Sequence, residues 1–109
     1  MLIDFHKMDE TILPNFKGGE KEYAAKMFFD TKNRIMHGRL ISGASIGMHT
    51  HETSSEIIYI LSGTASIICD GKPETLTAGQ CHYCPKGSTH TMVNNGIDDL
   101  VFFAVVPEQ

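Results

Sequence analysis

Two histidines and a glutamate lie close together in the stretch GMHTHETSSE, residues 47–56. His49 and His51 are separated by one residue, and Glu56 follows five positions after His51. Successive side chains of a β-strand alternate between two faces, so His49 and His51 are expected to point to the same side. Two imidazoles and a carboxylate are donors that suit a transition metal. The same letters also occur in surface loops, so a metal site needs a fourth ligand from elsewhere in the chain.

Two longer patterns surround these residues. The first runs Gly43, five residues, His49, one residue, His51, four residues, Glu56, six residues, Gly63. The second runs Gly79, five residues, Pro85, one residue, Gly87, two residues, His90, three residues, Asn94. These spacings resemble the two signature motifs of the cupin superfamily at every defining position. The short segment 64–78 between them resembles that of compact single-domain (type-2) cupins.

The resemblance implies both a fold and a metal site. It implies an all-β, single-domain, cupin-type antiparallel β-barrel or jelly roll. It assigns the fourth ligand to His90, so that His49, His51, Glu56 and His90 would hold one divalent transition metal ion. Three imidazoles and one carboxylate suit Fe, Mn, Ni, Cu or Zn and do not choose among them. The alternative is a barrel that keeps these residues and binds no metal, as in some members of the superfamily.

The rest of the sequence supplies strands to carry these ligands. Short apolar runs separated by turn residues are typical of an antiparallel sandwich or barrel. The runs occupy 23–29, 34–41, 46–51, 56–61, 64–69, 72–77, 80–84, 90–94 and 100–106. Between two of them, Asp70-Gly71 predicts a two-residue type I′ hairpin turn. Residues 1–22 are interpreted as an N-terminal arm or edge strand, and residues 23–109 as the barrel domain.

Strand alternation also suggests a pocket wall. Ile58 and Ile60 share the face of Glu56, Met92 shares the face of His90, and Phe102 and Ala104 lie on one face of the last run. We predict that these five apolar residues line the pocket, although core packing is the default for the last strand, whose two faces are both apolar.

Two arginines bear on the ligand of such a pocket. Arg34 and Arg39 fall on opposite faces of one run, so at most one of them can point inward. An inward arginine beside the metal would favour a carboxylate-bearing substrate, whereas exposure to solvent is the default for both.

Cys81 and Cys84 form a CxxC sequence that suggests a redox pair or a zinc knuckle. In an extended strand residues three apart point to opposite faces and lie about 10 Å apart, too far for a disulfide. We therefore do not expect a redox pair, and the roles of Cys81, His82 and Cys84 stay open. His82 and His37 are interpreted as strand residues rather than ligands, and Asn94 as a turn residue.

Composition limits the class of protein. The 109 residues suit one domain, 41% of them are hydrophobic, and the net charge is −4 with nine scattered basic residues. Nucleic acid and membrane partners are therefore not expected. An N-terminus without a signal pattern and an odd number of cysteines favour a cytoplasmic protein. Apolar outer strand faces predict a homodimer.

Three functions remain open from the sequence. The first is a metal-dependent enzyme of dioxygenase, isomerase or lyase type that acts on a small organic molecule. Tyr83 or a pocket thiol is the only candidate for its acid or base. The second is a non-catalytic cupin that binds or senses a small ligand. The third is a closed structural zinc site that serves stability alone.

Overall fold

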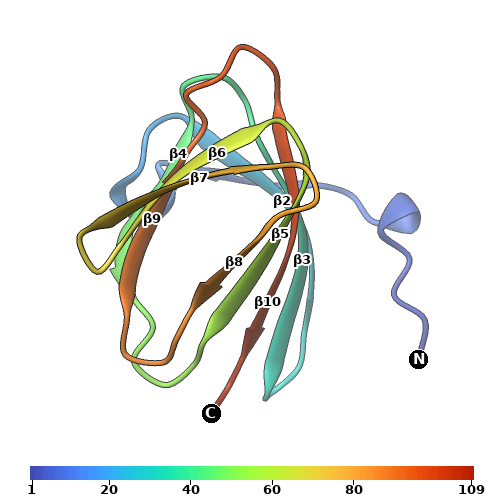
Figure 1. Ribbon diagram of the computed structural model, residues 1–109. Helices are drawn as coiled ribbons and strands as arrows, with labels where there is room; N and C mark the ends of the chain where they lie inside the picture. The colour runs from blue at the N-terminus through green and yellow to red at the C-terminus, as the bar shows by residue number, and fades with distance from the viewer.

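The computed structural model describes residues 1–109, and β-strands dominate it (Figure 1). The strands are β1 (Thr11–Pro14), β2 (Glu22–Phe29), β3 (Asn33–Leu40), β4 (Ser45–Thr50), β5 (Glu56–Ser62), β6 (Thr64–Cys69), β7 (Lys72–Thr77), β8 (Cys81–Cys84), β9 (Thr89–Val93) and β10 (Leu100–Pro107). Two short 3₁₀ helices, η1 (Phe5–Lys7) and η2 (Phe16–Gly18), lie near the N-terminus. All nine predicted runs form strands. The tenth strand, β1, lies within residues 1–22 and pairs with β2.

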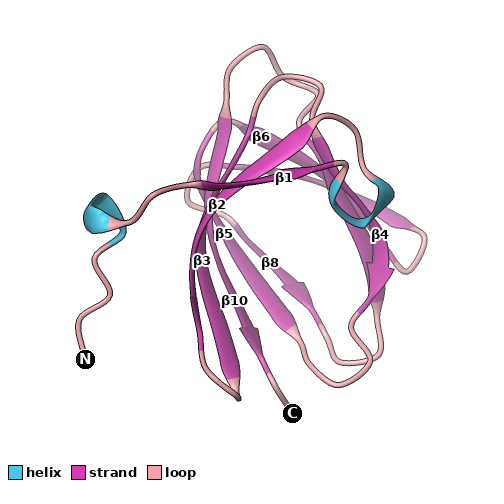
Figure 2. Cartoon of the chain, turned by 180° about the vertical axis from the view of Figure 1, so that it is seen from behind, coloured by secondary structure: helices cyan, strands magenta, loops and turns pink.

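The strands form two antiparallel sheets that face each other. The larger sheet has the order β1-β2-β3-β10-β5-β8, and the smaller sheet has the order β4-β9-β6-β7. No strand pairing joins one sheet to the other, so of the predicted barrel or jelly roll the sheets do not close into a barrel, and the fold is an open, jelly-roll type sandwich. Figure 2 shows β1 and β4 at neighbouring edges of the two sheets.

A non-strand connection takes the place of strand pairing between these two edges. The backbone N–H of Ser45 on β4 donates to the carbonyl of Glu20, while the Ser45 hydroxyl accepts from the Glu20 N–H at 2.8 Å. Residues 15–21, which include η2, therefore supply hydrogen-bond partners to the β4 edge. A sheet edge that is satisfied in this way needs no neighbouring strand.

The predicted turn between β6 and β7 is confirmed. Asp70 and Gly71 both have positive φ angles, 50° and 81°, as a type I′ hairpin requires. Glycine adopts this region without a Cβ penalty, and aspartate tolerates it better than most residues. The turn also contacts β9, since the Asp70 carboxylate accepts from the Thr89 N–H at 2.9 Å.

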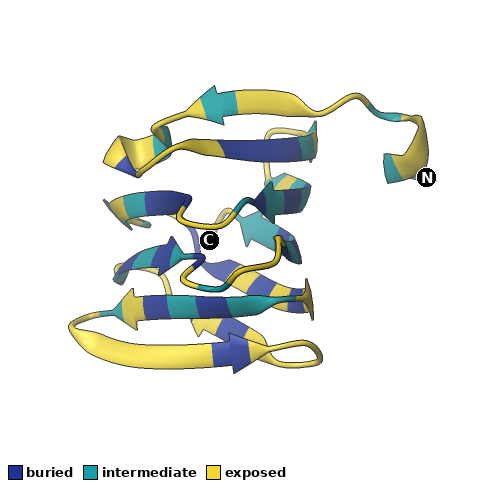
Figure 3. Ribbon diagram, turned by 90° about the horizontal axis from the view of Figure 1, so that it is seen from above, coloured by how far each residue is buried: buried dark blue, intermediate teal, exposed yellow.

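The core lies between the sheets, and burial alternates along the strands (Figure 3). Leu40, Ile60, Leu100 and Phe102 are among its fully buried side chains. Alternation leaves the other face of the large sheet partly apolar and exposed. The structure has no helix that is long and apolar enough to cross a membrane.

Candidate metal centre

A β-bulge in β4 orients His49 and His51 toward the pocket. Ile46 pairs with Met92 and His49 pairs with His90, so β4 advances three residues where β9 advances two. The extra residue in β4 changes the alternation, and Ile46 and His49 line the same pocket although an odd number of positions separates them. His51 follows the last residue of the strand, and its ring centroid lies 4.9 Å from that of His49, while the exposed Thr50 between them bonds the Thr89 hydroxyl at 2.7 Å. The predicted common face of His49 and His51 is therefore confirmed.

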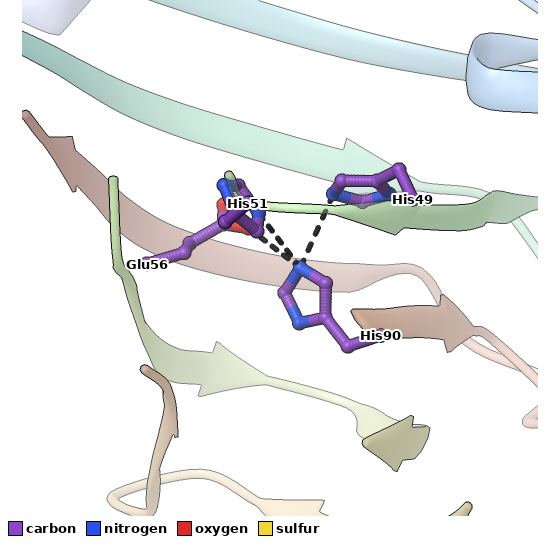
Figure 4. Close-up of side chains that lie close together, drawn as sticks. All are labelled: His49, His51, Glu56 and His90. Atoms are coloured by element: carbon purple, nitrogen blue, oxygen red, sulfur yellow. Dashed lines mark hydrogen bonds and ion pairs between the residues drawn. The ribbon is translucent and has the colours of Figure 1, made fainter. Parts of the chain in front are cut away.

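The four predicted ligands converge on one point (Figure 4). The His90 Nε2 atom lies 3.0 Å from His51 Nε2 and 3.2 Å from His49 Nε2. The Glu56 Oε1 atom lies 3.1 Å from His51 Nε2 and 3.0 Å from His90 Nε2. All four donor atoms lie within 4.8 Å of one another. Both sheets take part, because Glu56 begins β5 and His90 belongs to β9.

The other ring nitrogen of each histidine has a partner outside the cluster. His49 Nδ1 lies 2.8 Å from the Gly47 carbonyl, which only accepts, so this nitrogen carries a proton. His51 Nδ1 lies 3.2 Å from the Ser54 hydroxyl, and His90 Nδ1 lies 3.1 Å from His82 Nε2. Each partner can accept a hydrogen bond from Nδ1–H, and in that tautomer the Nε2 lone pair is free. Metal-binding histidines are commonly oriented by such bonds.

His82 connects the cluster to a carboxylate at the surface. It is fully buried and stacks on His90, with ring centroids 5.3 Å apart. His82 Nδ1 donates to the Glu74 carboxylate at 2.9 Å, and with one proton on the ring its Nε2 accepts a hydrogen bond from His90 Nδ1–H at 3.1 Å. Glu74 therefore fixes the proton positions on two imidazoles in series. The sequence correctly placed His82 in a strand with satisfied hydrogen bonds but did not show its contact with His90.

The electrostatics of the cluster favour a carboxylate and a neutral imidazole. Burial raises the pKa of Glu56, but hydrogen bonds that His51 and His90 donate when their Nε2 atoms carry a proton, as they can without a metal, outweigh burial and lower this pKa to about 2. Burial lowers the pKa of His49, and the neighbouring imidazole of His90 lowers it further. Glu56 is thus charged at neutral pH, and His49 resists protonation. A charged carboxylate and an unprotonated imidazole are the forms that bind a metal.

A pocket of about 600 Å³ opens above the four side chains. Its apolar lining includes Tyr23, Met36, Ile46, Ile58 and Met92. Of the five residues expected in the pocket wall, the structure places Ile58 and Met92 along this pocket, and it places Ile60, Phe102 and Ala104 in the core outside the lining. The strand parity of these three residues was correct, but the pocket occupies only one end of the space between the sheets.

Two charged side chains near the pocket separate as strand alternation requires. Arg34 lines the pocket and lies over the Phe29 ring at 5.2 Å. Arg39 points to the opposite face, where it donates to Glu10 at 2.8 Å and lies 3.6 Å from Asp99. Exposure to solvent, the default for both arginines, therefore holds for Arg34, which is exposed although it borders the pocket, whereas Arg39 is half-buried in its ion pairs.

The remaining predictions concern the β8 and β9 strands. Cys81 is exposed and Cys84 buried, so they face opposite ways, and all three cysteines are free. Tyr83 is 55% exposed on the outer face, and no cysteine lines the pocket. Both proposals for an acid or base are therefore wrong. Asn94 is a turn residue as predicted, since its side chain bonds the backbone of Leu40, Gly96 and Asp98.

A two-sheet β fold that gathers three histidines and a glutamate beside a pocket defines a jelly-roll protein with a candidate metal site. The chain belongs to the cupin family, because the Cupin domain family matches residues 36–106. The "Oxalate-binding protein" of Thermotoga maritima is 32% identical over 102 residues, which covers 86% of this chain and 83% of that protein.

Solved structures agree with this assignment. The crystal structure of a predicted oxalate decarboxylase from Thermotoga maritima superposes with a TM-score of 0.94 and 29% identity over 100% of both chains. KdgF from Halomonas sp. superposes with a TM-score of 0.80 and 20% identity, covering 100% of this chain and 94% of that chain. The second likeness supports the fold alone.

Proposed function

We propose that His49, His51, Glu56 and His90 bind one divalent transition metal ion, and that the chain uses it to act on a small carboxylate-bearing molecule. The proposal rests on the spacing of the donor atoms. Metal–nitrogen bonds of about 2.0–2.1 Å at right angles place neighbouring nitrogens about 3.0 Å apart. The Nε2 atoms of the cluster lie 3.0 and 3.2 Å apart.

The donor types limit the ion and the chemistry. Three imidazole nitrogens and one carboxylate suit Fe, Mn, Ni, Cu or Zn, whereas an all-oxygen set would suit Mg or Ca. Such an ion acts as a Lewis acid or, if it is iron, activates dioxygen. Four protein ligands leave two positions of a six-coordinate ion for water or substrate. The charge of Glu56 offsets one of the two positive charges of the ion.

Charge at the pocket favours an anionic ligand. Arg34 and Lys32 border the pocket together with the apolar wall. A guanidinium recognises a carboxylate through paired hydrogen bonds, and the apolar walls reduce the water that competes with them. The likeness to a protein named for oxalate binding and to a predicted oxalate decarboxylase points to the same ligand class. We therefore propose oxalate or a related small carboxylate as the ligand.

Catalysis is the first functional hypothesis, and ligand binding without turnover is the second. The pocket favours catalysis because the four donors open onto it, so an ion there is accessible to a substrate. The second reading has its own support in the residues that line the pocket. Besides the four ligands, only Tyr23, Glu108 and two lysines there can exchange protons. Burial raises the pKa of Tyr23, so its hydroxyl holds its proton at neutral pH.

One experiment separates these readings. Protein loaded in turn with Mn²⁺, Fe²⁺, Co²⁺ and Zn²⁺ is titrated calorimetrically with oxalate and then assayed for carbon dioxide, formate and oxygen uptake. Metal-dependent binding with product formation supports the enzyme, and binding without product supports the binding protein. A structural zinc site would instead show no oxalate binding and a melting temperature that falls on chelation. Arg34→Gln should weaken oxalate binding about tenfold or more, whereas Arg39→Gln on the outer face of the same strand should not.

We also propose that the chain forms a homodimer through the outer face of the large sheet. Ile57, Tyr59 and Leu61 on β5 are 40–43% exposed, and Tyr83 on the adjacent β8 is 55% exposed. These side chains form a continuous patch, since Ile57 pairs with Tyr83 across the two strands. Exposed apolar patches of this kind commonly mark a protein interface. A second copy would cover this patch and leave the pocket between the sheets free.

A further inference from the structure

A second group of metal-binding donors includes His82 and lies beside the candidate metal centre. Cys69 ends β6, and His82 and Cys84 lie on β8. The two sulfur atoms and one ring nitrogen lie within 4.8 Å of one another. Because β6 belongs to the small sheet and β8 is the edge strand of the large sheet, the three side chains meet between the sheets.

We propose that Cys69, His82 and Cys84 form a second binding site for a thiophilic metal ion such as Zn²⁺. Two thiolates and an imidazole are ligands that select zinc or copper(I) over harder ions. Binding replaces the two thiol protons with sulfur–metal bonds and releases both protons to solvent. An ion there would also join the two sheets at a place where no strand pairing does.

The surroundings of the thiols are consistent with a metal site and argue against a reactive thiol. Cys84 is fully buried, and burial together with the neighbouring Cys69 raises its pKa to about 12. Burial also raises the pKa of Cys69, although a hydrogen bond from Cys84 opposes this effect. Without metal both thiols therefore keep their protons at neutral pH and are poor nucleophiles. A bound cation stabilises the thiolates directly and overcomes this cost.

His82 connects the second site to the first, and this part of the inference rests on the proposed function of the first. Both ring nitrogens of His82 already hold hydrogen bonds, one to Glu74 and one to His90. An ion that binds His82 must therefore replace one of them. If the ion binds Nδ1 in place of Glu74, the ring proton of His82 lies on Nε2, where it faces the Nδ1 proton of His90. Replacing the bond to His90 leaves the buried His90 N–H without a partner. In either case we expect a filled second site to weaken metal binding at the first.

Sulfur-to-metal charge-transfer absorption tests the second site without relying on the first. Metal-free protein, reduced with a phosphine and shown to have three free thiols, is titrated with Co²⁺ and Cd²⁺. We expect a thiolate charge-transfer band that saturates with added metal. The band should disappear in Cys69→Ser and in Cys84→Ser. It should persist in Cys81→Ser, whose exposed thiol on the same strand is the matched control, and in His51→Ala, which removes a ligand of the first site.

The outcomes separate the two proposals. The absence of a thiolate band in wild-type protein would falsify the second site, and so would a band that persists in Cys69→Ser. The wild-type measurement needs no variant, so a misfolded mutant cannot hide the result. A band that persists in His51→Ala while that variant loses its nitrogen-ligated metal shows two separate sites. A second-site metal that leaves the affinity of the first unchanged would overturn the coupling through His82.

Discussion

His49 and His90 lie directly opposite each other on β4 and β9, with their Nε2 atoms 3.2 Å apart. This pairing links the two sequence motifs, which are forty-one positions apart at these residues. It depends on the bulge that precedes His49, because regular alternation from Ile46 would turn His49 to the opposite face. The candidate metal centre is therefore a property of the strand pairing as much as of the ligands themselves.

We expect His90→Gln to abolish most metal binding. His90 Nε2 is central to the cluster, since it lies within 3.2 Å of His49, His51 and Glu56 donor atoms. Elemental analysis of the purified protein measures the effect, with about one ion per chain expected at this centre in the wild type. His37→Gln is the matched control, because His37 lies on the outer face against the Phe5 ring. Equal metal content in His90→Gln and wild-type protein would contradict the ligand assignment.

We expect Glu74→Gln to weaken metal binding without removing a ligand. The Glu74 carboxylate can only accept, so it directs the proton of His82 and thereby that of His90. An amide can present either a donor or an acceptor, and this direction is lost. Loss of an outer hydrogen-bond partner of a metal ligand commonly lowers affinity about 10–100-fold. Competition with a chromophoric chelator measures the metal affinity. Glu52→Gln, an exposed substitution beside His51, is the control and should leave this affinity unchanged.

We expect Gly47→Ala to destabilise the protein and to misalign His49. A Cβ at this position would clash with the Lys17 carbonyl and lie 2.8 Å from the Gly19 nitrogen. Relief requires the β4 bulge to move away from the 15–21 segment, at a cost of about 1–3 kcal/mol. Urea unfolding gives the stability change, and elemental analysis gives the metal content. Gly96→Ala, where a Cβ would meet only the end of the Asn94 side chain, is the control; equal losses in both variants would refute the argument.

Much of the fold followed from the sequence because its signals were local. Alternating apolar runs and turn residues such as Asp70-Gly71 report on neighbouring residues, so nine strands could be predicted. The four donors could also be identified, because the resemblance relates their spacing to a known motif. Whether the sheets close depends on contacts between distant segments, and no local pattern shows that residues 15–21 rather than a strand satisfy the β4 edge.

The surroundings of the centre could not be predicted for the same reason. The contact between His82 and His90 joins β8 of the large sheet to β9 of the small sheet through side chains, and the partner of His82, Glu74, comes from β7. Strand parity gave the correct inward face for Phe102 but not the extent of the pocket along that face. Strand alternation puts His82 and Cys84 on the same face of β8. The sequence did not show which face of this strand points toward the core.

We expect the metal-free protein to lose stability as the pH falls. The pKa of Glu56 in the folded protein is lowered from 4.5 to about 2. Its contribution to the free energy of unfolding is therefore complete above about pH 4.5 and is lost as the pH falls through 2. The folded pKa of His49 is lowered from 6.5, so its contribution is complete above about pH 6.5 and declines below it. Urea unfolding across this range measures both. Glu56→Gln should flatten the acidic part of the profile and His49→Gln the part near neutrality; unchanged profiles in both variants would contradict the assigned shifts.

We expect Tyr59→Lys to dissociate the proposed homodimer while leaving each chain folded. Tyr59 lies near the middle of the exposed patch, opposite Phe103 on β10 and Cys81 on β8. In the dimer a lysine there would be buried against the partner's apolar surface, and burying a charge costs free energy. In the monomer it would be solvated, and surface substitutions usually change the free energy of unfolding by within about 0.5 kcal/mol. Sedimentation velocity measures the mass of each variant. Ile68→Lys is the matched control, because Ile68 is also 43% exposed but belongs to the small sheet. A wild-type chain that remains monomeric at high concentration would exclude the dimer, and dissociation by Ile68→Lys alone would move the interface to the small sheet.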